Sequence, residues 1–391
     1  MLKMKLKQLV LTCSLMSLIG CQTVKEEPIN ACQQKPTLLE SSNWLDQFTI
    51  DRDVIYQASA ANQLELNKYD LDGNLLFHKN LEINASDYKW PIEIHAKGDF
   101  IYLAYNQKAE NAVQYDELSN EFGIHKFSQE GDLIWSHVFS SENILNNSTF
   151  SLQQLGNQKG AYVLFSENAP YPDEIEQGVL SKAKIVKLNE NGVIEWEKEI
   201  SGHIALSNSI NVFDEHILVD LYYSAHQENP EYNLDGYIGF AKFSLNTKGD
   251  LLWAKPSNLY NAISHDYLFK DQKLLNFSNQ GSSVLIEELN VMTGEITLLH
   301  NIPTESIPHK IRASLGDSNQ IYVLVETENG SIQVLKLNAQ GNEIQRAYLD
   351  PANNIKDFEF PYFVVNDAVN ESFQNNEIRI INNDCLEWET L

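Results

Sequence analysis

Closely spaced oxygen-bearing side chains are the first feature of the sequence that could bind a metal ion. Asp70, Asp72 and Asn74 alternate around Gly73, as ligands do in the first half of a calcium-binding loop. The segment lacks the later bidentate acid that completes such a loop. An Asp-Gly pair between two alternating segments is also typical of a β-hairpin, so we interpret residues 70–74 as a turn. We therefore expect no metal site here and no bound cofactor.

The residue types used in catalysis occur without the spacing of a known catalytic motif. The 10 histidines are scattered, and the sequence has no HExxH motif, no CxxC pair, no phosphate-binding loop and no nucleophile elbow. Two hypotheses follow. The protein is either a non-enzymatic binding protein or an enzyme whose reactive groups meet only in the folded chain.

The N-terminus carries an export signal. Three lysines within the first seven residues precede the apolar segment Leu9–Ile19, which is typical of a secretory signal peptide and too short for a normal membrane span. The segment ends Leu-Ile-Gly-Cys at residues 18–21, which resembles a bacterial lipoprotein signal. The resemblance implies cleavage before Cys21 and acylation of its sulfur, with palmitate as a component. Because Gln22 replaces the aspartate of inner-membrane lipoproteins, it also implies the outer membrane.

Composition divides the chain into three parts. We expect a signal peptide at residues 1–20, a lipidated cysteine and flexible tether at 21–40, and one folded domain at 41–391. The net charge of −26 disfavours binding to nucleic acid or to bare anionic lipid. The protein would therefore contact the membrane through its lipid anchor. Its oligomeric state, and whether it faces the periplasm or the cell surface, stay open.

A short unit recurs throughout the folded part. In one copy Lys126-Phe127-Ser128 precedes Gly131, and Trp135 follows that glycine by four residues. The glycines of the six copies are Gly73, Gly131, Gly192, Gly249, Gly294 and Gly341. In the Gly249 copy we align Lys242-Phe243-Ser244 with the triplet, two residues further upstream. Leu298 takes the aromatic position after Gly294, and a seventh, degenerate copy has Asp384 followed by Trp388.

Each unit predicts a β-hairpin whose glycine supplies the positive φ of a tight turn. The aromatic residue would then pack between neighbouring sheets. Turns 43 to 61 residues apart, joined by short strands, indicate an all-β fold, a β-propeller of seven four-stranded blades. The last blade would use residues 358–365 and the C-terminus, unless a strand near Trp44 completes it. A β-sandwich with similar hairpins, or six or eight blades, are the alternatives.

The glycine turn followed by tryptophan resembles the quinoprotein-dehydrogenase-like (PQQ-like) propellers over nearly all of residues 40–391. That family includes enzymes that bind pyrroloquinoline quinone and calcium and typically use two adjacent cysteines. It also includes a non-enzymatic propeller lipoprotein of the outer-membrane assembly machinery. The resemblance therefore implies either an envelope enzyme, a quinoprotein-like oxidoreductase or a hydrolase with its site in the central funnel, or a scaffold. The present chain has no adjacent cysteines.

Three insertions between the expected second and third strands account for the longer spacings. They lie at residues 106–123, 166–181 and 224–237 and are rich in acidic residues and tyrosine. On a propeller they would emerge from one face, opposite the glycine turns, where loops commonly carry binding. The candidate binding residues are Tyr115, Tyr171, Asp173, His226 and Tyr232. The alternative is that these are tolerated surface insertions without a role.

Two cysteines remain after processing, because Cys13 leaves with the signal and Cys21 is acylated. Cys32 and Cys385 flank the folded domain in an oxidising compartment, and a propeller brings its first and last blades together. We predict a disulfide between them, with two free thiols as the alternative. Taken together, these features predict a lipid-anchored envelope propeller that binds a protein or glycan without catalysis.

Overall fold

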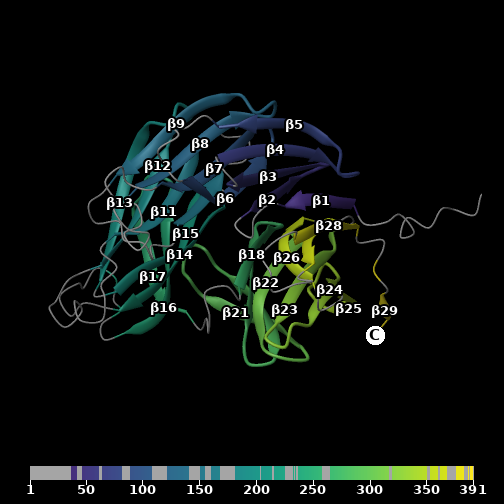
Figure 1. Cartoon of the computed structure of the whole chain (residues 1–391). Coiled ribbons are helices and arrows are strands. Elements are labelled where there is room, and N and C mark those ends of the chain that lie inside the picture. Colours follow the sequence, from purple (N-terminus) through teal and green to yellow (C-terminus); the bar gives the residue numbers. More distant parts are fainter. Residues whose placement is uncertain are drawn as a thin grey trace, which may run out of the picture. The chain divides into compact units, whose positions relative to one another are not determined.

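The computed structural model describes residues 37–41, 46–60, 64–81, 89–107, 121–140, 150–154, 160–167, 181–202, 204–213, 215–224, 232, 234, 237–257, 265–316, 319–349, 353–359, 362–367, 376–382, 386 and 388–390. They belong to the compact unit Pro36–Leu391. Its regular elements are β-strands arranged as a β-propeller (Figure 1). The predicted all-β propeller is therefore confirmed.

The strands follow one another in groups along the chain. The first three groups are β2 Gln47–Asp51, β3 Val54–Ala60, β4 Leu64–Asp70 and β5 Leu75–Asn80; β6 Lys89–Lys97, β7 Phe100–Gln107, β8 Glu121–Ser128 and β9 Leu133–Ser140; and β10 Phe150–Gln154, β11 Ala161–Glu167, β12 Ser181–Leu188 and β13 Ile194–Gly202. The next two are β14 Ile204–Phe213, β15 His216–Ser224, β16 Ile238–Asn246 and β17 Leu251–Pro256; and β18 His265–Lys270, β19 Lys273–Asn279, β20 Ser283–Leu289 and β21 Ile296–Pro303. The remaining strands are β22 Pro308–Leu315, β23 Ile321–Thr327, β24 Ile332–Leu337, β25 Glu343–Leu349, β26 Asn353–Glu359, β27 Tyr362–Asp367, β28 Asn376–Asn382, β29 Glu389–Thr390 and β1 Thr37–Ser41.

Each of the first five groups forms an antiparallel sheet whose strands lie in chain order. The two sheets formed by the remaining strands depart from the prediction of four strands drawn from one stretch of chain. The sheet β22–β25 has a fifth strand, because the C-terminal β29 pairs with the edge of β25. The sheet β26–β28 takes its fourth strand from the other end of the chain, because β1 pairs with β28. The prediction of seven blades, each made of four strands from one stretch of chain, is therefore corrected for these two sheets.

Strand β1 bears on two smaller predictions. It begins at Thr37, inside the segment expected to be tether up to residue 40, so the bound of the tether is corrected. It ends just before Trp44 and confirms the alternative that a strand near that residue completes the last blade. The predicted strand at residues 358–365 is in fact the end of β26 and most of β27, which pair with each other antiparallel. Joining the two ends of the chain in one sheet closes the circle of sheets without leaving that edge unpaired.

Five of the recurring glycine turns, those of Gly73, Gly131, Gly192, Gly249 and Gly341, share one geometry. In the turn of Gly131, the glycine N–H donates to the carbonyl oxygen of Ser128 at 3.0 Å, and the glycine φ is +78°. The Ser128 hydroxyl accepts from the N–H groups of Glu130 and Asp132 and so closes the turn from within. Asn189, Asn246 and Asn338 accept through their side-chain amides in the same way. A polar residue three positions before the glycine is thus part of the turn.

The aromatic residue packs between neighbouring sheets, as predicted, and the structure shows that it lies on the glycine turn of the next sheet. A Cβ atom added to Gly192 would lie 2.7 Å from the Trp135 indole, so only glycine allows this approach. The Trp135 indole N–H also donates to the carbonyl oxygen of Glu190, two residues before Gly192, at 2.8 Å. Phe77 meets Gly131, Trp196 meets Gly249 and Trp253 meets Gly294 in the same manner. These contacts link successive sheets.

Within a sheet, the aromatic residue ends a row of three side chains on adjacent strands. In β7–β9 the row is Tyr102–Lys126–Trp135, with the two rings 5.9 Å apart and edge to face. The Lys126 ammonium lies 3.9 Å from the centre of the nearby Phe100 ring. The repeat lysine is therefore a packing residue that covers rings with its charge, as cation–π contacts do. The corresponding rows are Tyr56–Lys68–Phe77 and Tyr162–Lys187–Trp196.

Three copies differ from the predicted register. In β16 the row position belongs to Ser244, which pairs with Trp253, so Lys242 is not the repeat lysine. In β21 the residue that meets the next glycine, Gly341, is His300 and not Leu298. The turn of Gly294 has one extra residue, because the Gly294 N–H donates to the carbonyl oxygen of Asn290, four positions back. The bulge that accompanies this turn lies two residues further from the polar turn residue than the bulges of the other copies do.

The third difference concerns the seventh copy. No hairpin follows β28 among the described residues, because the chain continues to β29 on another sheet. Trp388 lies 6.0 Å from Tyr322, and Lys336 lies 5.7 Å from the Trp388 ring. In the sheet β22–β25, the fourth strand has Gln345 where other sheets have the aromatic residue of the row. Trp388 therefore supplies the missing ring from an added strand.

Candidate functional site

Most of the residues predicted to carry function lie outside the described part of the chain. These are Cys21, Cys32, Cys385, Tyr115, Tyr171, Asp173 and His226. The last four of these residues belong to the predicted insertions. These insertions connect the second strand of a sheet to the third, namely β7 to β8, β11 to β12, and β15 to β16. Lipidation, the disulfide and binding by these residues stay predictions.

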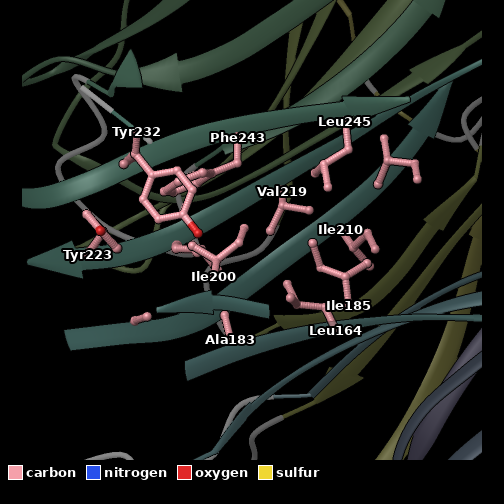
Figure 2. Close-up of a cluster of buried hydrophobic side chains, with 14 of the residues drawn as sticks. Leu164, Ala183, Ile185, Ile200, Ile210, Val219, Tyr223, Tyr232, Phe243 and Leu245 are labelled. Carbon is pink, nitrogen blue, oxygen red and sulfur yellow. The ribbon is translucent and has the colours of Figure 1, made fainter. Parts of the chain in front are cut away.

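Tyr232 is the exception, and its predicted role in binding has to be corrected. Its side chain is 4% exposed and belongs to a hydrophobic cluster with Tyr223 and Phe243 (Figure 2). The Tyr232 ring lies edge to face with Phe243 at 5.3 Å between centroids. Because the ring fills the core, it is not available as a contact for a partner. A tyrosine in an insertion can anchor that insertion, and composition does not distinguish the two roles.

A buried polar network lies between the sheets β14–β17 and β18–β21. At its centre is Asp220 on β15, whose carboxylate is fully buried. The carboxylate accepts from the ammonium of Lys242 at 2.8 Å and from the hydroxyl of Tyr267 at 3.0 and 3.1 Å. The Ser209 hydroxyl donates to it at 3.0 Å, and the Nε2 of His265 lies 3.3 Å away. Lys242 also contacts the Tyr267 hydroxyl directly.

Electrostatics keep this carboxylate ionised. Burial by itself raises the pKa of Asp220, but the charge of Lys242, together with the charge and hydrogen bond of His265, outweighs burial and lowers it below its usual value. Burial, followed by the charge of Asp220, raises the pKa of Tyr267 well above 10. The network is therefore an ion pair with a neutral phenol as an additional donor. Removing one member would leave an unpaired buried charge.

Ser209, His265 and Asp220 invite comparison with a hydrolytic triad, but their geometry differs. A triad histidine binds the serine through one ring nitrogen and the carboxylate through the other. Here Ser209 at 3.5 Å and Asp220 at 3.3 Å both lie at Nε2. The other nitrogen, Nδ1, is buried with no partner among the described residues. The arrangement supports a structural role: the Asp220–Lys242 ion pair lies within one sheet, and Tyr267 and His265 connect it to the next sheet. A lysine two residues out of the repeat register was the one signal of it in the sequence.

A cavity of about 340 Å³ lies between the sheets β18–β21 and β22–β25. Its apolar lining comes from Leu275, Ile286 and Leu299, and its other side is the turn of Gly341. Four charged side chains also line it: Lys270, Asp271, Lys273 and Glu288. The cavity is thus a mainly apolar space with charged groups of both signs, next to the point where His300 meets Gly341.

Exposed aliphatic side chains recur at the turn ends of the fourth strands. On β9, Leu133 is 56% and Ile134 is 47% exposed, although both follow the glycine turn closely. We define the apolar band as these positions in five successive sheets: Leu75, Leu76, Leu133, Ile134, Val193, Ile194, Leu252, Ile296, Leu298 and Leu299. Because the sheets are linked through their glycine turns, the band follows those links from sheet to sheet. Extended apolar surface of this kind marks interaction sites.

The described residues lack two features that would indicate a metal site or a membrane span. They contain no group of three or more His, Cys, Asp or Glu side chains placed to hold a metal ion. They also contain no helix long and apolar enough to span a membrane.

Comparison with known proteins shows the fold and nothing finer. No protein family and no curated protein matches the sequence. Among solved structures, the chain is similar to one reported as a structural and mechanistic analysis of two prolyl endopeptidases, with 9% identity and a TM-score of 0.50 over 91% of this chain and 50% of that one. It is also similar to dihydro-heme d1 dehydrogenase NirN in complex with DHE, with 11% identity and a TM-score of 0.47 over 89% of this chain and 67% of that one. A third similar structure is a protein of unknown function from Bacteroides caccae, with 11% identity and a TM-score of 0.43 over 76% of this chain and 93% of that one. Identities this low show a shared β-propeller fold alone.

Proposed function

We propose that this protein is a lipid-anchored β-propeller of the bacterial cell envelope that binds a protein or glycan partner without catalysis. The signal at residues 18–21 supports acylation of Cys21 and anchoring in the outer membrane. The packing of aromatic residues on glycine turns supports membership among the PQQ-like propellers. Neither feature names the partner.

The apolar band is the observation that carries the binding function. The chain has a net charge of −26, yet it leaves one to three Leu, Ile or Val side chains exposed shortly after the glycine turn in each of five successive sheets. Exposing such groups to water is unfavourable by about 25 cal/mol per Å² of apolar surface, and covering them by a partner recovers this free energy. The band therefore fits an extended partner that contacts several sheets at once.

Crosslinking in intact cells tests the proposal. The wild-type protein is compared with a band variant, Leu133→Ser with Ile134→Ser, and with Val138→Ser, which changes a 44% exposed residue further along the same strand. We expect the band variant to lose most of the crosslinked partner and the Val138 control to keep it, with both thermal midpoints close to wild type. Equal crosslinking by all three proteins would contradict a role of the band.

The alternative function is an envelope enzyme. Among the described residues, Ser209, His265 and Asp220, which lie buried between two sheets, come nearest to a catalytic arrangement. If purified protein hydrolyses ester or peptide substrates, and Ser209→Ala abolishes the activity without unfolding the protein, the enzyme hypothesis replaces the binding one. The shared use of Nε2 leads us to expect no such activity.

A further inference from the structure

The cavity at the sheet β18–β21 coincides with a row of side chains that has lost its rings. In three other sheets this row contains a tyrosine on the second strand and an aromatic residue on the fourth, as in Tyr102–Lys126–Trp135. In β18–β21 the row is Leu275–Glu288–Thr297. Two of these residues, Leu275 and Glu288, line the cavity. The space that aromatic rings fill elsewhere is therefore open here.

The neighbouring turn is already prepared for an aromatic group. At other junctions the indole N–H donates to a turn carbonyl and the ring lies on a glycine, as Trp135 does on Gly192. At this junction the smaller imidazole of His300 lies on Gly341 and contacts the carbonyl oxygen of Gln340 at 2.8 Å. An imidazole occupies less volume than an indole, and the remaining space is the cavity lined by Leu299 and Gly341.

The next sheet shows how an added strand can fill such a position. Its row ends in Gln345, which has no ring, and the short strand β29 pairs with the edge of β25 at Gln345 and Arg346. The residue before β29, Trp388, then lies against Tyr322 and Lys336. An extended segment paired with the strand edge thus delivers an aromatic side chain to a row that lacks one. This is the β-strand addition by which many peptides are bound.

The sheet β18–β21 has the features needed for the same addition. Among the described strands, β21 pairs with β20 alone, so its other edge is open. Its side chains Leu298 and Leu299 belong to the apolar band and are 56% and 38% exposed. An added strand would cover them and satisfy the backbone groups of the edge.

Charge indicates which residues would accompany the aromatic side chain. The ammonium of Lys270 lies at the cavity and donates to two backbone carbonyl oxygens, of Asn319 and Ala339, at 2.9 and 3.2 Å. Lys273, also at the cavity, pairs with Glu288 at 2.7 Å and has a side chain that is 57% exposed. Lys273 already has a carboxylate partner in Glu288, so an acidic group beside the aromatic residue would complement Lys270. In the internal example, Glu387 and Glu389 flank Trp388 in the sequence.

We infer that this cavity and the edge of β21 bind an extended segment of another protein, in which an aromatic residue is flanked by acidic residues. The inference rests on the proposed binding function and assigns it a defined subsite. The aromatic ring enters the cavity between the sheets, and the backbone of the segment continues the sheet beyond β21.

A labelled peptide with the sequence of residues 386–391, Leu-Glu-Trp-Glu-Thr-Leu, is a direct probe. Its binding to the intact protein is measured by fluorescence anisotropy, beside a peptide in which alanine replaces the tryptophan. Leu299→Trp fills the cavity from within. Leu252→Trp is the matched control, because Leu252 is 39% exposed, against 38% for Leu299, and lies beside a junction already filled by Trp253.

We expect saturable binding of the tryptophan peptide, weakened about tenfold or more by the alanine replacement or by Leu299→Trp. Leu252→Trp should change it less than about twofold, and Lys273→Glu should weaken it. Absence of binding up to about 1 mM peptide, or equal loss in both tryptophan variants, would overturn the inference. If the crosslinked partner of the apolar band persists in that case, the proposed function survives and only this subsite fails.

The source of the segment is tested separately by sedimentation of the unlabelled protein. A monomer supports a segment of another protein. A dimer that is lost in both Leu299→Trp and Trp388→Ala would show instead that a second copy of this chain provides the strand, and would overturn the assignment to another protein.

Discussion

A methyl group added to Gly192 should cost far more stability than the same group added to Gly330. Both glycines have a positive φ, of +76° and +82°, so each alanine variant should lose about 1–2 kcal/mol from backbone strain. At Gly330 no atom lies within 4 Å of the added Cβ, whereas at Gly192 ring atoms of Trp135 lie at 2.7 Å. Displacing the indole should lower the free energy of unfolding by about a further 1–3 kcal/mol, the usual range for overpacking.

The free energy of unfolding, measured by denaturant titration of both variants, gives the comparison. A double-mutant cycle sharpens it, because Trp135→Ala removes the obstacle. In that background Gly192→Ala should cost only the backbone term of about 1–2 kcal/mol. Trp135→Ala alone should cost about 3 kcal/mol, near the lower limit for a buried tryptophan because the indole is half-buried. Equal costs for Gly192→Ala and Gly330→Ala would refute the packing of tryptophan on glycine.

Three further predictions concern the buried network, the added strand and the termini. Asp220→Asn leaves Lys242 unpaired and should cost about 3–5 kcal/mol, more than the double replacement Asp220→Leu with Lys242→Met. Because folding lowers the pKa of Asp220, its contribution is present above the unfolded value of 3.8 and is lost as the pH falls from 3.8 toward the lower folded value, so the stability difference between wild type and Asp220→Asn should shrink in that window. Trp388→Ala should lower the free energy of unfolding by about 2–4 kcal/mol and Trp388→Phe by less, as read from urea melts; no change would mean that β29 is not part of the folded sheet. Non-reducing peptide mass analysis should show Cys32 joined to Cys385, and Cys21→Ser should release the mature protein from the membrane fraction; two alkylatable thiols in the first case, or a membrane-bound variant of unchanged mass in the second, would count against these assignments.

The propeller could be predicted because its determinants are local. A polar residue, two further residues and a glycine make the same turn wherever they occur, and the aromatic residue four positions later reaches the next turn, as Trp135 and Trp196 do. The lysine of the repeat was aligned correctly in the copies of Gly73, Gly131, Gly192 and Gly341.

The predictions failed where one residue changed the register or where distant segments met. The extra residue before Gly294 moved the bulge, so His300 replaced Leu298 at the next glycine. Lys242 was aligned with the repeat because a lysine-phenylalanine-serine triplet recurs, although Ser244 holds the row position. The pairing of β1 with β28, the delivery of Trp388 and the partners of Asp220 all join residues far apart in the sequence, which no local pattern encodes.

Photocrosslinking from single positions in intact cells tests the binding function most directly. A photoreactive residue is placed at Ile134 in the apolar band and, separately, at exposed Asn329, in the turn between the second and third strands of another sheet. If the apolar band is the binding surface, we expect a crosslinked partner from Ile134 and none from Asn329. A partner captured from Asn329 but not from Ile134 would contradict it and would return binding to the connections between the second and third strands.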